Sequence, residues 1–119
     1  MNFQDYVSKK SQLSVIGLGY VGLPIALELA KKFKVIGFDI NPKRVELMRN
    51  KIDPSNELDS SAFDGADIYF TANPEDLKAA SFYIVAVPTP VDDHKVPDLL
   101  PLQRASETLG KVLKKGDTV

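Results

Sequence analysis

Three glycines constrain the fold of this chain more than any other feature of its sequence. Gly17, Gly19 and Gly22 lie between a short apolar run and a segment with helical spacing, and they fit the pattern G-x-G-x-x-G. In that position the first glycine permits a tight turn, the second lets a diphosphate approach the bare backbone, and the third lets the helix pack closely on a sheet. The same pattern occurs in turns that bind no ligand, so a binding role needs support from elsewhere in the chain.

Strand-like and helix-like segments alternate along the sequence. The strand-like segments are short and apolar, and they span 13–16, 34–39, 66–70, 82–87 and, as the start of a fifth, 117–119. The helix-like segments have helical spacing or a start signal, and they span 20–32, 42–49, 75–80 and 98–115. This alternation predicts an α/β fold of the Rossmann type, a doubly wound parallel sheet with strand order 3-2-1-4 and a truncated fifth strand.

The first expected helix carries two specific predictions. Val21, Ile25 and Leu29 recur at intervals of four residues and mark its expected apolar face. Glu28 and Lys32 have the spacing of an ion pair one helical turn apart.

Other segments are predicted from their turn and start signals. Asn41–Pro42 and Asn73–Pro74 each resemble a helix N-cap followed by a proline, which tolerates the first helical position. Residues 1–10 are polar and are expected to be loosely held. Residues 51–65 are rich in turn-forming residues, and we expect a loop there with at most one short helical turn.

An acidic residue ends the second predicted strand. Asp39 follows the glycine turn by roughly twenty residues, where a carboxylate hydrogen-bonds the hydroxyl groups of the adenosine ribose. This carboxylate would repel a 2′-phosphate, which favours NAD over NADP, although acids at strand ends are also common as solvated surface residues. Arg44 is the competing observation, because an arginine near this position can hold a 2′-phosphate, contact the ribose or adenine, or lie on the helix surface.

The fourth predicted strand ends in a proline-rich sequence. Val87, Pro88 and Thr89 come at its carboxyl end, beside the first strand, where ligands bind in open α/β sheets. Thr89 would hydrogen-bond a ribose or phosphate of the cofactor. The alternative is a rigid proline turn with no ligand contact.

Composition excludes several classes of function. The formal net charge is −1, so neither nucleic acid nor an anionic membrane is favoured as a partner. The chain has no cysteine, which leaves it no disulfide, thiolate nucleophile or cysteine-bound metal. Residues 1–6 lack the apolar core of a signal peptide, and a cytoplasmic location is expected. Asp92–His94 is interpreted as a solvated loop, and no metal site is expected.

Three parts of the sequence resemble one known family. Residues 15–24, residues 37–41 with Arg44 beyond them, and residues 87–90 are similar in sequence and order to the start of the UDP-glucose/GDP-mannose dehydrogenase family. Within that family, residues 87–110 most resemble the UDP-N-acetylhexosamine 6-dehydrogenases of surface polysaccharide synthesis.

The resemblance implies oxidation of the C6 alcohol of a UDP-sugar to a carboxylate, using two NAD and a covalent intermediate on a cysteine. It assigns the turn to the pyrophosphate, Asp39 and Arg44 to the adenosine ribose, and the end of the fourth strand to the cofactor. The cofactor-binding residues expected on this basis are Gly17, Leu18, Gly19, Tyr20, Val21, Gly22, Asp39, Arg44, Val87, Pro88 and Thr89. No catalytic residue or metal ligand is expected in this chain.

The family's nucleophilic cysteine, catalytic lysine and sugar-binding residues have no counterpart here. We therefore expect residues 1–119 to be the NAD-binding Rossmann part of a longer enzyme, inactive alone, with the UDP-sugar bound by other domains and with possible self-association. Two alternatives remain: the same module from an NAD(P)-dependent hydroxy-acid-type dehydrogenase, and a non-catalytic dinucleotide-sensing domain.

Overall fold

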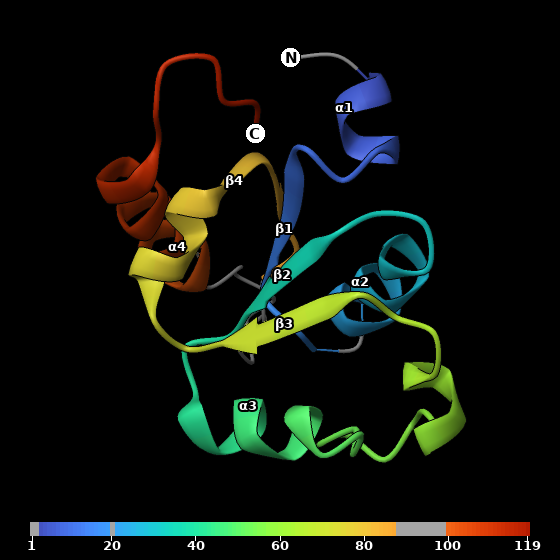
Figure 1. The fold of residues 1–119 in the computed structure, drawn as a ribbon. Helices are drawn as coiled ribbons and strands as arrows, with labels where there is room; N and C mark the ends of the chain where they lie inside the picture. Colours follow the sequence, from blue (N-terminus) through green and yellow to red (C-terminus); the bar gives the residue numbers. More distant parts are fainter. Residues whose placement is uncertain (1–2, 20, 88–99) are drawn as a thin grey trace.

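The computed structural model describes residues 3–19, 21–87 and 100–119, and a parallel sheet forms its centre (Figure 1). The strands are β1 (Gln12–Ile16), β2 (Val35–Phe38), β3 (Ile68–Thr71) and β4 (Ala80–Val85). Their order in the sheet is β3-β2-β1-β4, which confirms the predicted topology. In the register of the sheet, Val15 of β1 lies between Gly37 of β2 and Ile84 of β4.

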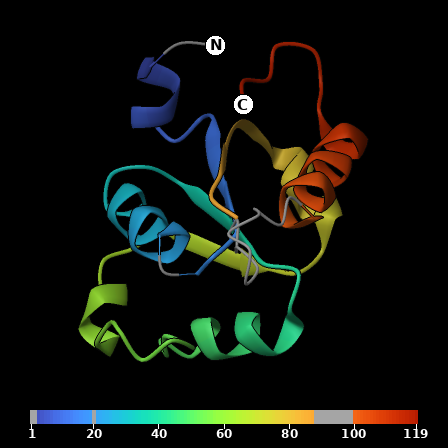
Figure 2. The ribbon, with the colours of Figure 1, turned by 180° about the vertical axis from the view of Figure 1, so that it is seen from behind.

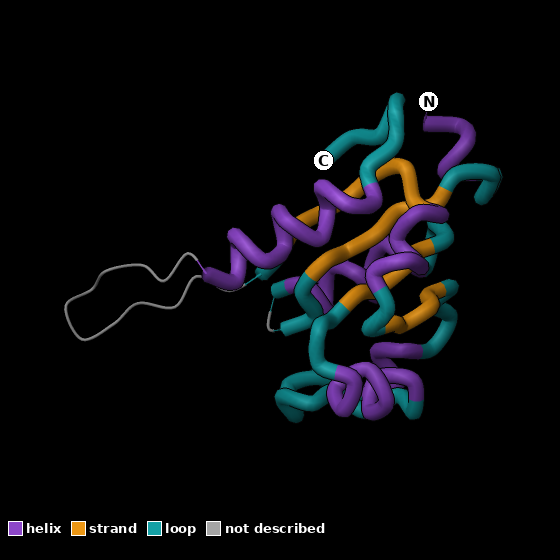
Figure 3. The backbone as a smooth tube through the Cα atoms, turned by 90° about the vertical axis from the view of Figure 1, so that its left-hand side faces the viewer, coloured by secondary structure: helices purple, strands orange, loops and turns teal. Residues whose placement is uncertain are grey.

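Helices cover both faces of this sheet. They are α1 (Phe3–Val7), α2 (Gly22–Ala30), α3 (Pro42–Arg49) and α4 (Leu100–Val112), with 3₁₀ helices at Ser60–Phe63 and Pro74–Ala79. The ribbon seen from behind and the tube turned by 90° both place α4 on the opposite side of the sheet from α2 (Figures 2 and 3). None of the helices in the described residues is long and apolar enough to cross a membrane.

Each face has its own hydrophobic core, because successive side chains of a strand point to opposite faces. Val15 packs with the residues of α2 and α3 on one face, and the neighbouring Ile16 packs with Ala105 and Leu109 of α4 on the other. Both strand residues are almost fully buried, at 0% and 2% exposure. The doubly wound arrangement therefore follows from the alternation within β1.

The two predicted start signals are confirmed. The Asn41 side chain accepts hydrogen bonds from the backbone N–H groups of Lys43 at 3.0 Å and Arg44 at 3.4 Å, and Pro42 begins α3. Asn73 caps the segment Pro74–Ala79 in the same way, although that segment is a 3₁₀ helix. The 51–65 region is a loop with one short helical turn, Ser60–Phe63, as expected.

The predicted apolar face of α2 is wrong at Val21 and Ile25, whereas Leu29 packs against the core as expected. Val21 is 62% exposed and Ile25 is 37% exposed, whereas Leu23 and Ala26 are buried. Nearly every residue of α2 is apolar, so the spacing fits more than one face, and close packing of Gly22 on the glycine turn selects the buried one.

The predicted ion pair in α2 is also wrong. Glu28 pairs with Lys31 at 3.0 Å instead of with Lys32. The helix ends at Ala30 with Lys31 as its C-cap, so Lys32 lies beyond the last turn.

The N-terminal segment is more ordered than expected. It forms α1, and Tyr6 is buried with its hydroxyl 3.0 Å from the Ser81 Oγ and its ring edge-on to Phe82. At the other end, the predicted fifth strand is present as a single parallel bridge between Phe82 and Thr118. α4 ends at Val112, before the predicted end, and its predicted start falls outside the described residues.

Candidate dinucleotide-binding site

The glycine turn joins β1 to α2, and its three glycines have different surroundings. Gly17 has a φ of +95°, and a Cβ there would lie 2.9 Å from the carbonyl oxygen of Ala86. A Cβ at Gly22 would overlap the carbonyl oxygen of Gly17, so α2 packs directly on the turn. A Cβ at Gly19 would meet no described atom within 4 Å. Packing therefore requires two of the glycines, while the third leaves the backbone open.

The helix after the turn begins without a side-chain cap. Val21 is the N-cap residue of α2, and among the described residues no side-chain cap is found there. α3 differs, because Asn41 caps it. The first amide groups of a helix carry a partial positive charge and need an acceptor, so the uncapped start of α2 is suited to an anion.

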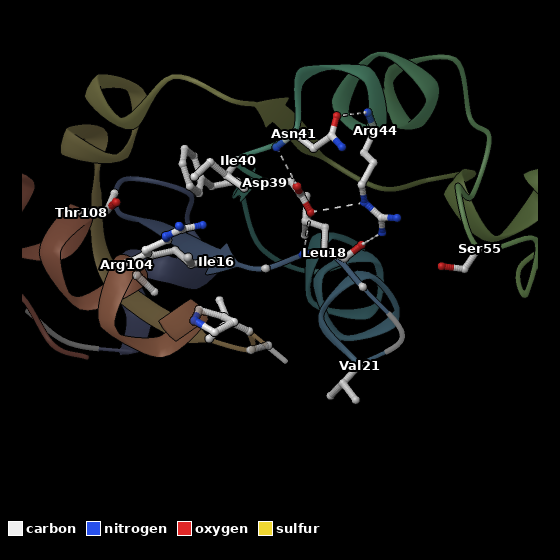
Figure 4. A pocket seen from close by; sticks show the side chains of 17 residues that line it. Ile16, Leu18, Val21, Asp39, Ile40, Asn41, Arg44, Ser55, Arg104 and Thr108 are labelled. Carbon is white, nitrogen blue, oxygen red and sulfur yellow. Dashed lines mark hydrogen bonds and ion pairs between the residues drawn. The ribbon is translucent and has the colours of Figure 1, made fainter. Parts of the chain in front are cut away.

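Asp39 points toward the turn from the end of β2. Its carboxylate accepts hydrogen bonds from the backbone N–H groups of Leu18 at 3.3 Å and Asn41 at 3.0 Å, and its side chain is 12% exposed. Arg44 lies against it, with Nε 3.6 Å from Oδ2 of Asp39, and donates to the carbonyl oxygen of Leu18 at 3.1 Å (Figure 4). The acid, the arginine and the turn thus form one connected group.

These residues line a cavity of about 830 Å³ at the carboxyl ends of β1 and β2 (Figure 4). Its walls come from the glycine turn, the end of β2, the start of α3, the end of β4 and one face of α4. The lining residues are Ile16, Gly17, Leu18, Gly19, Val21, Phe38, Asp39, Ile40, Asn41, Arg44, Ser55, Ala86, Val87, Pro101, Arg104, Ala105 and Thr108.

The sequence prediction missed the wall that α4 provides. Pro101, Arg104, Ala105 and Thr108 all line the cavity. They are separated by three, four and seven residues, the spacing of one helical face, so the spacing marks the face. The spacing does not reveal what this face contacts. That contact depends on the order of the strands in the sheet, which places α4 beside the turn.

Several predicted residues cannot be placed. Val87 lines the cavity, but Tyr20, Pro88 and Thr89 lie outside the described residues, as does Asp92–His94. Their expected contacts with the cofactor stay predictions. In the part of the chain that the structure describes, no group of three histidine, cysteine or acidic side chains is placed to hold a metal ion.

A dinucleotide fits this site on structural grounds. The backbone at Gly19 is open at the uncapped start of α2, and the carboxylate of Asp39 lies at the end of the next strand, hydrogen-bonded to the turn. The cavity volume lies in the usual range for cofactor and small-molecule sites. Fold and site together define a dinucleotide-binding domain of the Rossmann type.

Comparisons with known proteins narrow this class. Residues 11–119 match the model of the UDP-glucose/GDP-mannose dehydrogenase family, NAD binding domain. The chain belongs to this family, and its cofactor is NAD.

Individual relatives agree with the family match. The chain is 54% identical to protein CapL of Staphylococcus aureus, over 85% of this chain and 24% of that protein. It is 51% identical to the UDP-N-acetyl-D-glucosamine 6-dehydrogenase of Pseudomonas aeruginosa, over 93% of this chain and 26% of the enzyme. The solved UDP-N-acetyl-mannosamine dehydrogenase Cap5O from S. aureus superposes with a TM-score of 0.78 at 31% identity, over 90% of this chain and 27% of that one. The chain thus spans about a quarter of the length of these relatives.

Proposed function

We propose that this chain is the NAD-binding part of a UDP-N-acetylhexosamine 6-dehydrogenase, which oxidises the C6 alcohol of a UDP-sugar to a uronate. The observation that carries the cofactor role is the carboxylate of Asp39 bonded to the N–H of Leu18 within the glycine turn. The sugar class is supported by 51% identity to a UDP-N-acetyl-D-glucosamine 6-dehydrogenase. The parts of that enzyme which this chain does not match would supply the sugar site and the reacting groups.

The proposed roles of the site residues follow from their geometry. Gly19 and the amide groups at the start of α2 would hold the diphosphate, and Asp39 would accept hydrogen bonds from the adenosine ribose. Arg44 would keep the Asp39 carboxylate directed at the turn. When bound, NAD supplies the hydride acceptor for alcohol oxidation. No described side chain is assigned a part in that chemistry.

The same geometry favours NAD over NADP. A 2′-phosphate on the adenosine ribose would meet the carboxylate of Asp39, and like charges in a half-enclosed site repel each other. Arg44 does not offer a free positive charge to that phosphate, because its Nε lies 3.6 Å from the same carboxylate. The ion pair therefore supports a role for Arg44 beside Asp39 rather than in contact with a 2′-phosphate.

Calorimetric titration of the chain with NAD and NADP tests the cofactor proposal. The unchanged chain is expected to bind NAD more tightly, and Asp39→Ala should weaken NAD binding by about tenfold or more, since a hydrogen bond to a charged group contributes about 1.5–3 kcal/mol. Asp64→Ala is the matched control, because Asp64 is an exposed acid paired with Lys51 away from the cavity. Tighter binding of NADP by the unchanged chain would overturn the assignment.

The substrate class needs the full-length enzyme that carries this domain. Production of NADH is measured with UDP-N-acetylglucosamine, with UDP-glucose and with a simple hydroxy acid. Turnover of the N-acetylated sugar alone supports the proposal. Turnover of the hydroxy acid with neither sugar accepted would contradict it.

A further inference from the structure

β3 is the neighbour of β2 on the side away from β1, and β2 and β3 end in register with each other. The backbone N–H of Asp39, the first residue after β2, donates a hydrogen bond to the carbonyl oxygen of Thr71 at 3.1 Å. Thr71 is the last residue of β3. We propose that Thr71 is a positioning residue for Asp39: its side-chain hydroxyl, bonded to Asp76, fixes the backbone from which the Asp39 carboxylate reaches the glycine turn.

The Thr71 hydroxyl has partners for both its donor and its acceptor functions. Its Oγ1 donates a hydrogen bond to Oδ2 of Asp76 at 2.5 Å and accepts one from the backbone N–H of Asn73 at 3.0 Å. Thr71 is 1% exposed, so water does not compete for these bonds. A hydrogen bond to a carboxylate is charge-assisted and is about twice as strong as one between neutral groups. The Asp76 carboxylate therefore fixes the orientation of the Thr71 side chain.

Asp76 is itself carried by a well-anchored segment. It lies in the 3₁₀ helix Pro74–Ala79, whose start is capped by the side chain of Asn73. The next residue, Leu77, is 0% exposed and belongs to the core on the α4 face of the sheet. The carbonyl oxygen of Leu77 accepts a hydrogen bond from the buried Tyr83 hydroxyl at 2.8 Å. The acceptor for the Thr71 hydroxyl is thus attached to backbone that is held on both sides.

The position of the Asp39 backbone decides where its carboxylate lies, because an aspartate side chain is short and has only two torsion angles. The carboxylate accepts a hydrogen bond from the N–H of Leu18 at 3.3 Å, near the long end of the range for such bonds. A backbone shift of about 0.5 Å would break this bond. The inference rests on the proposed function, in which the same carboxylate accepts hydrogen bonds from a ribose. Loss of its alignment would therefore weaken cofactor binding.

The first test uses the chain without cofactor and follows the backbone amide of Leu18 by ¹H–¹⁵N NMR. Thr71→Val keeps the shape of the side chain and removes the hydroxyl, so it should move the Leu18 resonance in the direction seen with Asp39→Ala. Thr71→Ser keeps the hydroxyl and should restore the resonance. Ser14→Ala is the matched control, because Ser14 also carries a buried strand hydroxyl but donates it to the carbonyl oxygen of Phe82 at 3.3 Å. It should leave the Leu18 resonance in place.

The second test is calorimetric titration with NAD in two backgrounds. Thr71→Val should raise the Kd for NAD by about fivefold, Thr71→Ser should recover most of this loss, and Ser14→Ala should leave the Kd unchanged. In a chain that already carries Asp39→Ala, Thr71→Val should raise the Kd no further, because a residue that acts through Asp39 then has no carboxylate to position. A purely structural role of the hydroxyl would give the same rise in both backgrounds.

Failure of this inference is distinguishable from failure of the proposed function. If Asp39→Ala weakens NAD binding but Thr71→Val leaves either the Leu18 resonance or the Kd unchanged, or raises the Kd equally in both backgrounds, only the positioning role is wrong. If the unchanged chain binds no NAD, the cofactor proposal fails, and the Leu18 resonance still decides whether Thr71 holds Asp39. Circular dichroism establishes that each variant is folded. Should Thr71→Val not fold, Asp76→Asn replaces it, since it keeps an oxygen acceptor, loses the charge and should move the Leu18 resonance the same way by a smaller amount.

Discussion

The guanidinium of Arg44 lies against the carboxylate of Asp39, with Nε 3.6 Å from Oδ2. The two side chains come from different elements, Asp39 from the end of β2 and Arg44 from the first turn of α3. Because Arg44 also donates to the carbonyl oxygen of Leu18, the pair connects both elements to the glycine turn. The ion pair therefore helps to hold the carboxylate of Asp39 beside the glycine turn.

Replacing Arg44 should weaken both the fold and cofactor binding. Arg44→Ala removes the ion pair and one hydrogen bond, and the pair is partly shielded, so we expect a loss of about 1 kcal/mol in the free energy of unfolding. The Kd for NAD should rise several-fold because Asp39 is no longer held in place. Urea denaturation and calorimetry measure the two effects, with Lys51→Ala as the control for an exposed pair. An unchanged NAD affinity would show that Arg44 does not position the acid.

Substitutions at two glycines of the turn should have different effects, one on folding and the other on NAD binding. A Cβ at Gly22 would overlap the carbonyl oxygen of Gly17, so Gly22→Ala should cost more than about 3 kcal/mol or prevent folding. Gly19→Ala has open space and no positive φ, so the chain should fold with a change below about 1 kcal/mol. Its methyl group would nevertheless occupy the surface that the diphosphate needs, and NAD binding should fall by about tenfold or more. Melting curves and calorimetry give both values, and a Gly19→Ala chain that binds NAD normally would contradict the assigned site.

Local chemistry explains which features the sequence predicts well. The capping by Asn41, the turn at Gly17 and the position of Asp39 each depend on a few neighbouring residues, and all three are found as expected. The buried face of α2 is set by Gly22 packing on Gly17. Because α2 is apolar on almost every side, the spacing of its apolar residues does not show which side is buried.

The α4 wall of the cavity shows the same limit at larger scale. In the sequence, Arg104 looks like any exposed arginine of a helix. In the structure β4 pairs with β1, so α4 lies beside the turn and Arg104 lines the cavity. Its place in the cavity wall depends on contacts between segments far apart in the sequence, as expected for a parallel sheet with crossovers, since Gly17 and Arg104 are 87 positions apart. Sequence motifs locate the turn and the acid but not the opposite wall.

Stability should fall in acid through Asp117, which follows α4. Burial alone would raise its pKa, but hydrogen bonds from the backbone and side chain of Lys114, together with the charge of Lys114, hold the pKa below its ordinary value. A carboxyl with a lowered folded-state pKa stabilises the fold above its unfolded pKa, and this stability is lost as pH falls through the folded pKa. The free energy of unfolding of the unchanged chain should therefore decline below about pH 4.

Asp117→Asn isolates that contribution. At neutral pH it should be less stable by about 1–2 kcal/mol because it loses charged hydrogen bonds, and the difference from the unchanged chain should shrink as the pH is lowered. Urea denaturation at several pH values measures the difference, and one that is constant with pH would contradict the role of Asp117. Asp67→Asn is the control, since Asp67 forms an exposed pair with Lys9.

Asp53 should determine the shape of the loop that borders the cavity. It is 6% exposed, and its carboxylate accepts backbone hydrogen bonds from Ser55 at 2.9 Å, Glu57 at 3.0 Å and Leu58 at 2.9 Å. Asp53→Ala leaves these donors without their acceptor, so the free energy of unfolding should fall by about 2–3 kcal/mol. Because Ser55 also lines the cavity, NAD affinity should also fall, by a smaller factor than for Asp39→Ala.

The matched control for Asp53 is Asp59, an exposed acid that accepts one backbone hydrogen bond, from Ser60 at 2.8 Å. Asp59→Ala should cost no more than about 1 kcal/mol, since its donor remains accessible to water, and it should leave NAD binding unchanged. Hydrogen exchange of residues 53–58 gives an independent measure, because loss of a shared acceptor should speed exchange of these amides selectively. Equal losses of stability in the two variants would mean that the loop is held by its packing, with no special contribution from the buried carboxylate.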